Sequence, residues 1–209
     1  MYIFFYSELN KVYETKPRVL QSFPQINFNQ TFANVFDKCI DPSTLNVTFK
    51  LAHDALPVAY RLHAYGMPID KNCSLCKKEA ETVQHLFYYC TQVHKARQLL
   101  TKCFRAIIAK GASPEAIRFS ILDETIDQMN RKTVLILLSE YRYVIWHMRN
   151  LARFEKKNTN SDQVYSLLIN RLKFRILTDN SRLPLQAFDN IWSDICTVTD
   201  DKLDFIFSV

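Results

Sequence analysis

The sequence predicts an all-α protein, built as an irregular helical bundle. Only 2 of its 209 residues are Gly, so the chain has few of the turn residues that β-hairpins and phosphate-binding loops require. Apolar residues instead recur at the 3.6-residue spacing of a helix over long stretches, and helix-capping residues precede several of these stretches. We expect strand structure only in one tight turn, beginning near residue 73.

The composition indicates a folded, basic protein. Hydrophobic residues make up 48% of the chain and the formal net charge is +6, which favours a real hydrophobic core and polyanionic partners. No apolar run approaches the ~18 residues of a membrane span, and the opening residues lack the basic start of a signal peptide. We therefore expect an intracellular protein, of the nucleus or cytoplasm, that does not bind membranes.

The N-terminal segment is rich in aromatic residues, and Pro17 and Pro24 interrupt it. Because proline breaks a helix interior, we expect residues 1–40 to form a strap across a core, or to be the remnant of a longer upstream region. A short helix is expected within this segment, at 31–39.

Two helices are expected next, at 42–56 and 58–65. Pro57 separates two apolar stretches, and Gly66 suits the residue that follows a helix C-terminus. An amphipathic helix is then expected at 91–110, because its apolar residues share one side of the helix and its basic residues the other.

The C-terminal half should contain the longest helix. Ser113-Pro114-Glu115 is a strong helix start, and an apolar stripe predicts a long helix at 130–157. After a polar break, Ser161 is expected to cap a helix that ends at 178. A last short helix is expected at 185–196, before an acidic tail.

One stretch between the expected helices carries metal-ligating residues. Cys73, Cys76, His85 and Cys90 have the spacing C-x2-C-x8-H-x4-C, and a tetrahedral zinc ion takes four such thiolate and imidazole ligands. The last two are five residues apart, about 140° around an ideal helix, so we expect His85 in a loop or first turn, or a local distortion between the two. The spacing predicts a small structural zinc site, with Zn²⁺ as the cofactor, inserted between the helices.

Other interpretations of the cysteines were weighed against zinc. A C-x-x-C pair can be a redox site, but the strand-helix setting of thioredoxin-like motifs is not found. Six cysteines could form disulfides, although a chain this long has little need of them. His94 could replace His85 as a ligand. The remaining cysteines are interpreted as small core residues: Cys39, Cys103 and Cys196.

The stretch LPVAYRLHAYGMPIDKNCSLCKKEAETVQHLFYYC, residues 56–90, resembles the zinc-binding domain that follows the polymerase in non-LTR (LINE-type) retrotransposon reverse transcriptases. The likeness covers about 44–100. It implies that the four residues named above are the zinc ligands, and it suggests a zinc-binding domain at 41–112 followed by a helical region at 113–209. Polymerase and endonuclease motifs are not found, so we expect the C-terminal tail of such an element, without enzyme activity of its own.

The resemblance implies a nucleic-acid-binding module for RNA or DNA with little sequence preference. The expected contacts surround the metal site or form an arc beside a tryptophan on the long helix, where three arginines recur at helical spacing: Lys77, Lys78, Lys95, Lys102, Arg105, Arg142, Trp146, Arg149 and Arg153. The alternative is a protein-interaction module that docks on a reverse-transcriptase polymerase domain or another partner. A zinc hydrolase or deaminase would need an open coordination position and a general acid or base, which the four-ligand motif does not offer.

Overall fold

The computed structural model describes residues 22–199 and 202–206, and it confirms the all-α prediction. The N-terminal helices are α3 (Phe28–Val35), α4 (Pro42–Ala52) and α5 (Ala59–Ala64). A π-helical turn (His85–Tyr89) and a 3-10 turn (Thr91–Val93) lead into α6 (His94–Ile108) and α7 (Pro114–Phe119). The C-terminal part consists of α8 (Gln128–Phe154), α9 (Ser161–Arg182), α10 (Leu185–Trp192), β1 (Cys196–Thr199) and β2 (Lys202–Phe205).

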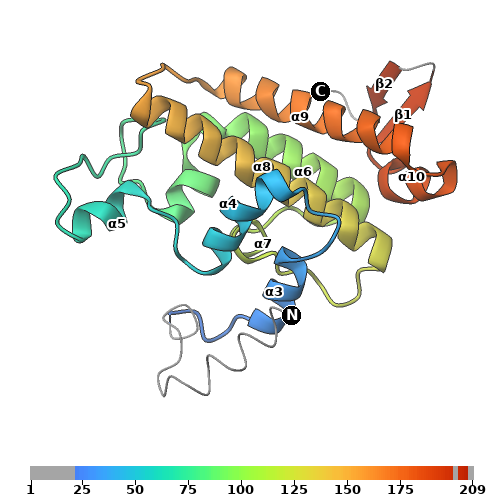
Figure 1. Cartoon of the computed structure of the whole chain (residues 1–209), viewed down its shortest axis with the longest axis horizontal. Coiled ribbons are helices and arrows are strands. Elements are labelled where there is room, and N and C mark those ends of the chain that lie inside the picture. The colour runs from blue at the N-terminus through green and yellow to red at the C-terminus, as the bar shows by residue number, and fades with distance from the viewer. Residues whose placement is uncertain (1–21, 200–201, 207–209) are drawn as a thin grey trace.

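Helix α8 is the centre of the molecule. It packs against α4, α6, α9 and α10, and Figure 1 shows it crossing the structure with α4 in front, α6 behind and α9 along its upper side. Five consecutive residues near its start, 134–138, are buried at 0–1% exposure. A helix that is apolar on all sides must be covered on all sides, and α8 is covered in this way.

One hydrophobic core joins the two segments expected at 41–112 and 113–209. Leu51 and Leu100 from the first segment and Leu137 and Leu168 from the second belong to the same buried cluster. The aromatic strap expected at the N-terminus lies partly outside the described residues. Its described part places Phe23 and Phe28 against Phe119, with ring centroids 5.0 and 5.9 Å from that ring.

The prediction that strands would occur only near the metal ligands is wrong. An isolated bridge does join Asn72 and Ala80, but β1 and β2 form an antiparallel hairpin near the C-terminus, with Cys196 opposite Phe205 and Thr199 opposite Lys202. The expected helix at 185–196 ends at Trp192, and the β-branched run that follows favours a strand.

Helix boundaries follow the capping residues. The Ser113 hydroxyl accepts a hydrogen bond from Ala116 N, as the start signal predicts. The cap of α9 is Asn160, one residue before the expected Ser161, because the Asn160 and Gln163 side chains bond to each other's backbone N–H in a capping box. Gly66 has φ +84° just after α5, a conformation that glycine adopts without steric cost.

Helix lengths also exclude a membrane span in the described part of the chain. None of its helices combines the length and the apolar character needed to cross a bilayer.

Candidate metal centre

The first two ligands come from a tight hairpin turn. Cys73 N donates to Glu79 O at 2.7 Å and Lys77 N donates to Cys73 O at 2.8 Å, which closes the turn around Cys76. Lys77 takes φ +60° to make this reversal. The two thiols, three positions apart, therefore face the same side of the turn.

The other two ligands come from the π-helical turn. Cys90 N donates to His85 O at 2.7 Å, a hydrogen bond between residues five apart that is characteristic of a π-helix. The Thr82 hydroxyl accepts from His85 N at 3.0 Å and holds the start of the turn. The wider turn brings positions 85 and 90 to one side, where an α-helix would separate them. The expected local distortion is therefore present.

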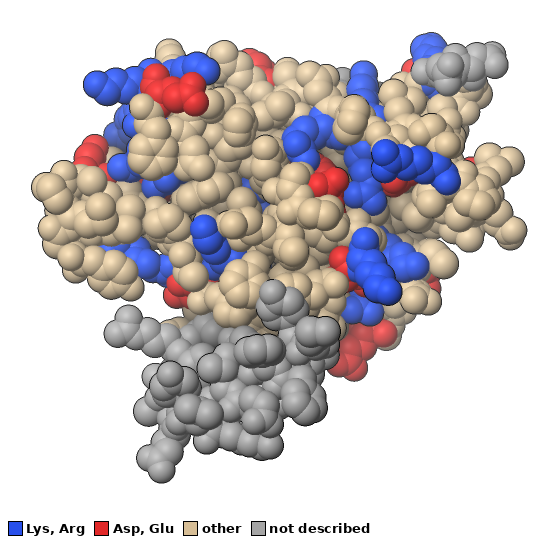
Figure 2. All heavy atoms as spheres, viewed as in Figure 1, with Lys and Arg blue, Asp and Glu red and all other residues tan. Residues whose placement is uncertain are grey.

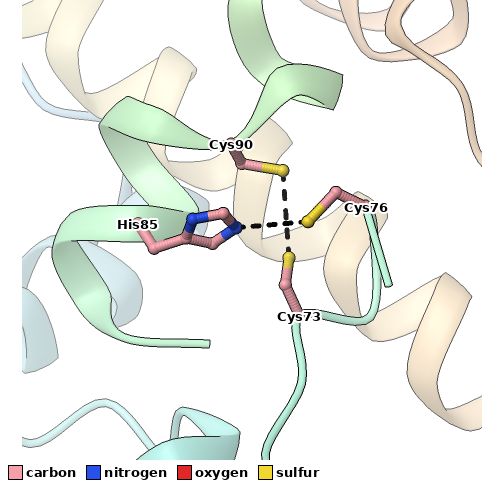
Figure 3. A group of neighbouring side chains, drawn as sticks. All are labelled: Cys73, Cys76, His85 and Cys90. Atoms are coloured by element: carbon pink, nitrogen blue, oxygen red, sulfur yellow. Dashed lines mark hydrogen bonds between the residues drawn. The ribbon is translucent and has the colours of Figure 1, made fainter. Parts of the chain in front are cut away.

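The structure brings the four predicted ligands together (Figure 3). Their ligand atoms all lie within 4.8 Å of one another, with Cys73 Sγ 3.8 Å from Cys90 Sγ and Cys76 Sγ 3.3 Å from His85 Nε2. Tetrahedral zinc with Zn–S bonds of about 2.3 Å requires sulfur atoms about 3.8 Å apart. The cluster can therefore hold one metal ion, and its three sulfurs and one imidazole fit zinc.

Hydrogen bonding prepares the Cys73 thiol for a metal, although burial opposes its ionisation. Cys73 and Cys90 are buried, whereas Cys76 is half-buried. Because the two buried thiols share a proton, their hydrogen bond lowers the pKa of Cys73 to about 5 and raises that of Cys90. The Leu75 and Cys76 N–H groups also donate to the Cys73 sulfur and favour the thiolate. Zinc binds the thiolate form, so these N–H groups support metal binding.

A carboxylate orients the imidazole ligand. His85 Nδ1 lies 3.1 Å from Glu79 Oε2, and the Glu79 side chain is 67% exposed. This hydrogen bond places the proton on Nδ1 and leaves Nε2 to face the three sulfurs. Carboxylate partners of this kind fix the tautomer of metal-binding histidines.

Glu81 ties the ligand hairpin to α8, a role that sequence reasoning did not identify. Its side chain is 0% exposed. One oxygen accepts from Arg149 Nη2 at 2.6 Å and from Ala59 N at 2.8 Å, and the other accepts from Ser74 N and Ser74 Oγ, each at 3.1 Å. Burial alone would raise the pKa of Glu81, but the hydrogen bond and charge of Arg149 outweigh it and hold the pKa below its usual value.

The prediction of an exposed basic arc on α8 is wrong, because two of its three arginines are buried. Arg142 is 0% exposed and donates to Ile117 O at 2.6 Å and to Ala116 O at 2.9 Å, so it caps the end of α7. Arg149 is 1% exposed and pairs with Glu81. The physical reason is that α8 is enclosed by other helices, so even the polar side of its pattern lies inside the protein.

The third arginine of that arc and the tryptophan beside it lie at the boundary of the core. The Arg153 side chain is 15% exposed, and its Nη2 lies 3.6 Å from Glu81 Oε2. Trp146 is half-buried, with the Arg149 guanidinium carbon 4.5 Å from its ring centroid. The tryptophan therefore already stacks on a cation within the protein.

The remaining basic residues from the sequence are exposed. Lys77 and Lys78 lie on the ligand hairpin, and Lys102 and Arg105 lie on α6. Lys95, also on α6, forms an ion pair with Asp162. The exposed charge nearest in sequence to the metal ligands is thus on the hairpin itself.

The other cysteines lie outside the metal cluster. Cys103 and Cys196 are buried and Cys39 is half-buried. Desolvation raises the pKa of each of these thiols to about 12, so they remain protonated and unreactive at neutral pH. His94, the expected substitute ligand, is exposed and is not part of the cluster.

Comparison with known proteins identifies the metal-binding part of the chain. No curated protein and no solved structure matches the chain. A family model does match, over residues 13–96, a range that contains all four ligands, and its description is zinc-binding in reverse transcriptase. This match confirms the resemblance seen in the sequence: residues 13–96 are similar to the zinc-binding domain of reverse transcriptases.

Proposed function

We propose that this zinc-binding module binds nucleic acid and has no polymerase or other catalytic activity of its own. The observation that carries the proposal is the ligand hairpin, where Lys77 and Lys78 project into solvent directly after Cys76. A rigid hairpin presents these charges at fixed positions, and lysine contacts with phosphates give affinity that does not depend on base sequence.

The coordination of the metal centre supports a structural role. Three thiolates and one imidazole fill a tetrahedral zinc ion, which leaves no position for a reactive water. The centre joins the hairpin to the π-helical turn, and Glu81 joins the same hairpin to α8. Zinc, when bound, would therefore hold a nucleic-acid-binding surface in shape.

A protein-interaction role is the second candidate, and a specific surface favours it. Tyr60 and Tyr65 of the α5 region are 52% and 66% exposed, and Met67 just after it is 45% exposed. Large apolar side chains that are exposed are candidates for contact with a partner protein. A polymerase domain of a reverse transcriptase is the partner that the family description suggests.

Salt dependence separates the two candidates. Binding of the zinc-loaded chain to fluorescent single-stranded RNA and DNA of mixed sequence is measured from 50 to 200 mM salt. Two or three phosphate contacts predict that log K falls with log salt at a slope of about −1.5 to −2. Absence of binding at 50 mM salt would reject the nucleic-acid proposal. Salt-insensitive binding of a polymerase domain, lost in a Tyr60→Ser/Tyr65→Ser variant, would establish the second candidate.

A further inference from the structure

A cationic pocket lies between the ligand hairpin and the end of α8. Its volume is about 330 Å³, and its lining includes four basic residues and one carboxylate: Lys77, Arg153, Lys156, Lys157 and Asp70. Figure 2 shows Lys and Arg atoms gathered over the end of α8 and the loop that follows it, beside acidic atoms. The pocket therefore has an excess of positive charge in a confined space.

Two of these lysines are available to a ligand. Lys157 is paired with Glu155 at 2.7 Å, and Arg153 lies near Glu81. In contrast, neither Lys77 nor Lys156 forms an ion pair among the residues that the structure describes. Both are exposed. These two residues therefore supply most of the positive charge in the pocket that is not paired with a carboxylate.

The backbone fixes the positions of both lysines. Lys77 closes the ligand hairpin with φ +60°, and Lys156 follows the end of α8 with φ +53°. Lys157 N donates to Leu151 O at 3.3 Å and completes the reversal at the helix end. A left-handed conformation is costly for a residue with a Cβ, and glycine is usual at both kinds of position.

The pocket also holds polar groups that lack partners. Thr159 is 8% exposed, and its hydroxyl is buried without a hydrogen bond. The Arg153 Nε is likewise buried and unpaired. An unsatisfied buried polar group costs about 1–3 kcal/mol, and few occur in native proteins. Both residues line the pocket, so a bound ligand with several acceptor oxygens would place acceptors next to these donors.

We infer that this pocket binds a phosphate group, with Lys77 and Lys156 supplying charge and Thr159 and Arg153 supplying donors. The inference rests on the proposed function to the extent that the phosphate belongs to a nucleic-acid backbone. A free phosphate or pyrophosphate offers the same oxygens. Lys77 and Arg153 were among the contacts expected from the sequence, whereas Lys156, Thr159 and the pocket that brings the four residues together were not.

The decisive variant is Lys77→Gly/Lys156→Gly in the full, zinc-loaded chain. Glycine removes both charges but suits the left-handed backbone at each position, so zinc content and thermal stability should stay unchanged. Affinity for a single-stranded oligonucleotide at 50 mM salt should fall about tenfold, and the salt slope should flatten by about 1.4, which corresponds to two phosphates. Lys173→Gln/Arg182→Gln removes the same charge from exposed sites of α9 outside the pocket and should change neither value.

Thr159→Val gives a second, independent test. It removes the unpaired hydroxyl while keeping the shape of the side chain, so stability should be unchanged or higher. A ligand that accepts from this hydroxyl should nevertheless bind several-fold more weakly. Unchanged affinity in both this variant and the double glycine variant would overturn the inference. Binding by the wild-type chain would still support the proposed function, which would then rest on Lys78 of the two hairpin lysines.

Inorganic pyrophosphate distinguishes the remaining outcomes if the wild-type chain binds no oligonucleotide. Amide resonances of Lys77, Lys156 and Thr159 are followed by ¹⁵N NMR during titration. Shifts at these three residues that are absent in the double glycine variant would retain the pocket as a site for a small phosphate ligand, although the proposed function would fail. No shifts in the wild-type chain would overturn the pocket as well.

Discussion

Glu81→Gln tests the connection between the ligand hairpin and α8. The substitution keeps the size of the side chain but replaces a carboxylate that accepts from Arg149, Ala59 and Ser74. Glutamine has one acceptor oxygen and one donor nitrogen. Because protein donors approach both oxygens of Glu81, the donors on one side would then face the NH₂ group of glutamine instead of an acceptor. The Arg149 guanidinium is 1% exposed and has no other carboxylate partner among the described residues. After the substitution it keeps only two neutral acceptors, the Pro57 carbonyl and the Asn150 amide oxygen.

The expected cost is large for one residue. Removing one partner of a buried ion pair typically costs about 3–5 kcal/mol, because the other charge remains buried and unpaired. In a domain of about 200 residues each 1 kcal/mol shifts Tm by about 2–4 °C. We therefore expect Tm to fall by roughly 10 °C. Arg149→Met in the same chain should recover part of this loss, because it removes the unpaired charge.

The assay is urea unfolding at fixed free zinc, followed by tryptophan fluorescence. Glu81 has a folded pKa below its usual value of 4.5, so its stabilisation is complete above about pH 4.5. It is lost as the pH falls through the lower pKa of the folded state. The difference between wild type and variant should accordingly be constant near pH 7 and shrink below pH 4.5.

The matched control is Glu79→Gln, two residues away on the same hairpin. Its side chain is 67% exposed and is hydrogen-bonded only to His85 in the described structure. At fixed saturating zinc the substitution should therefore lower the free energy of unfolding only through weaker zinc binding, by about 1.4–2.7 kcal/mol for a 10–100-fold loss of zinc affinity. If Glu81→Gln is no more destabilising than this control at pH 7, the connection does not stabilise the fold as argued.

Three further outcomes follow from single contacts. Glu79→Gln should lower zinc affinity about 10–100-fold, measured by competition with a chelator, because the partner of His85 loses its charge. Asn160→Ala should destabilise the protein by about 1 kcal/mol in urea unfolding, whereas Ser161→Ala should change stability by less than about 0.5 kcal/mol, because Asn160 is the cap of α9. Arg142→Met should cost about 1–3 kcal/mol, because it removes the Arg142 donor from the buried Ile117 carbonyl and one of the two donors to the Ala116 carbonyl, and it should not change the affinity of the folded protein for oligonucleotides.

The metal centre could be predicted because its information is local. All four ligands lie within 18 residues. The spacing of His85 and Cys90 excluded an undistorted α-helix as the common source of both ligands, and the structure has a π-helical turn there. Glu81 lies inside the same stretch, but its partner is 68 positions away. Only the packing of α8 against the hairpin shows that this carboxylate is structural.

The prediction of an exposed basic arc was wrong because periodicity distinguishes the apolar side of a helix from the polar side. It does not show how many of these sides other helices cover. The run Val134–Leu138 offered a signal, since five consecutive apolar residues occupy every side of a helix. That signal favours a central helix and therefore buried Arg142 and Arg149. The cap of α9 also had a signal, since Asn160 and Gln163 fit the capping-box spacing.

Zinc stoichiometry of the purified chain and two cysteine variants tests the central claim most directly. Cys90 and Cys103 are both buried thiols, but only Cys90 belongs to the cluster of four. Mass spectrometry under native conditions should find one zinc per chain in wild type and in Cys103→Ala, and a loss of zinc in Cys90→Ala, with faster amide exchange at 66–92. Full zinc occupancy in Cys90→Ala, or no zinc in the wild-type chain, would contradict the account.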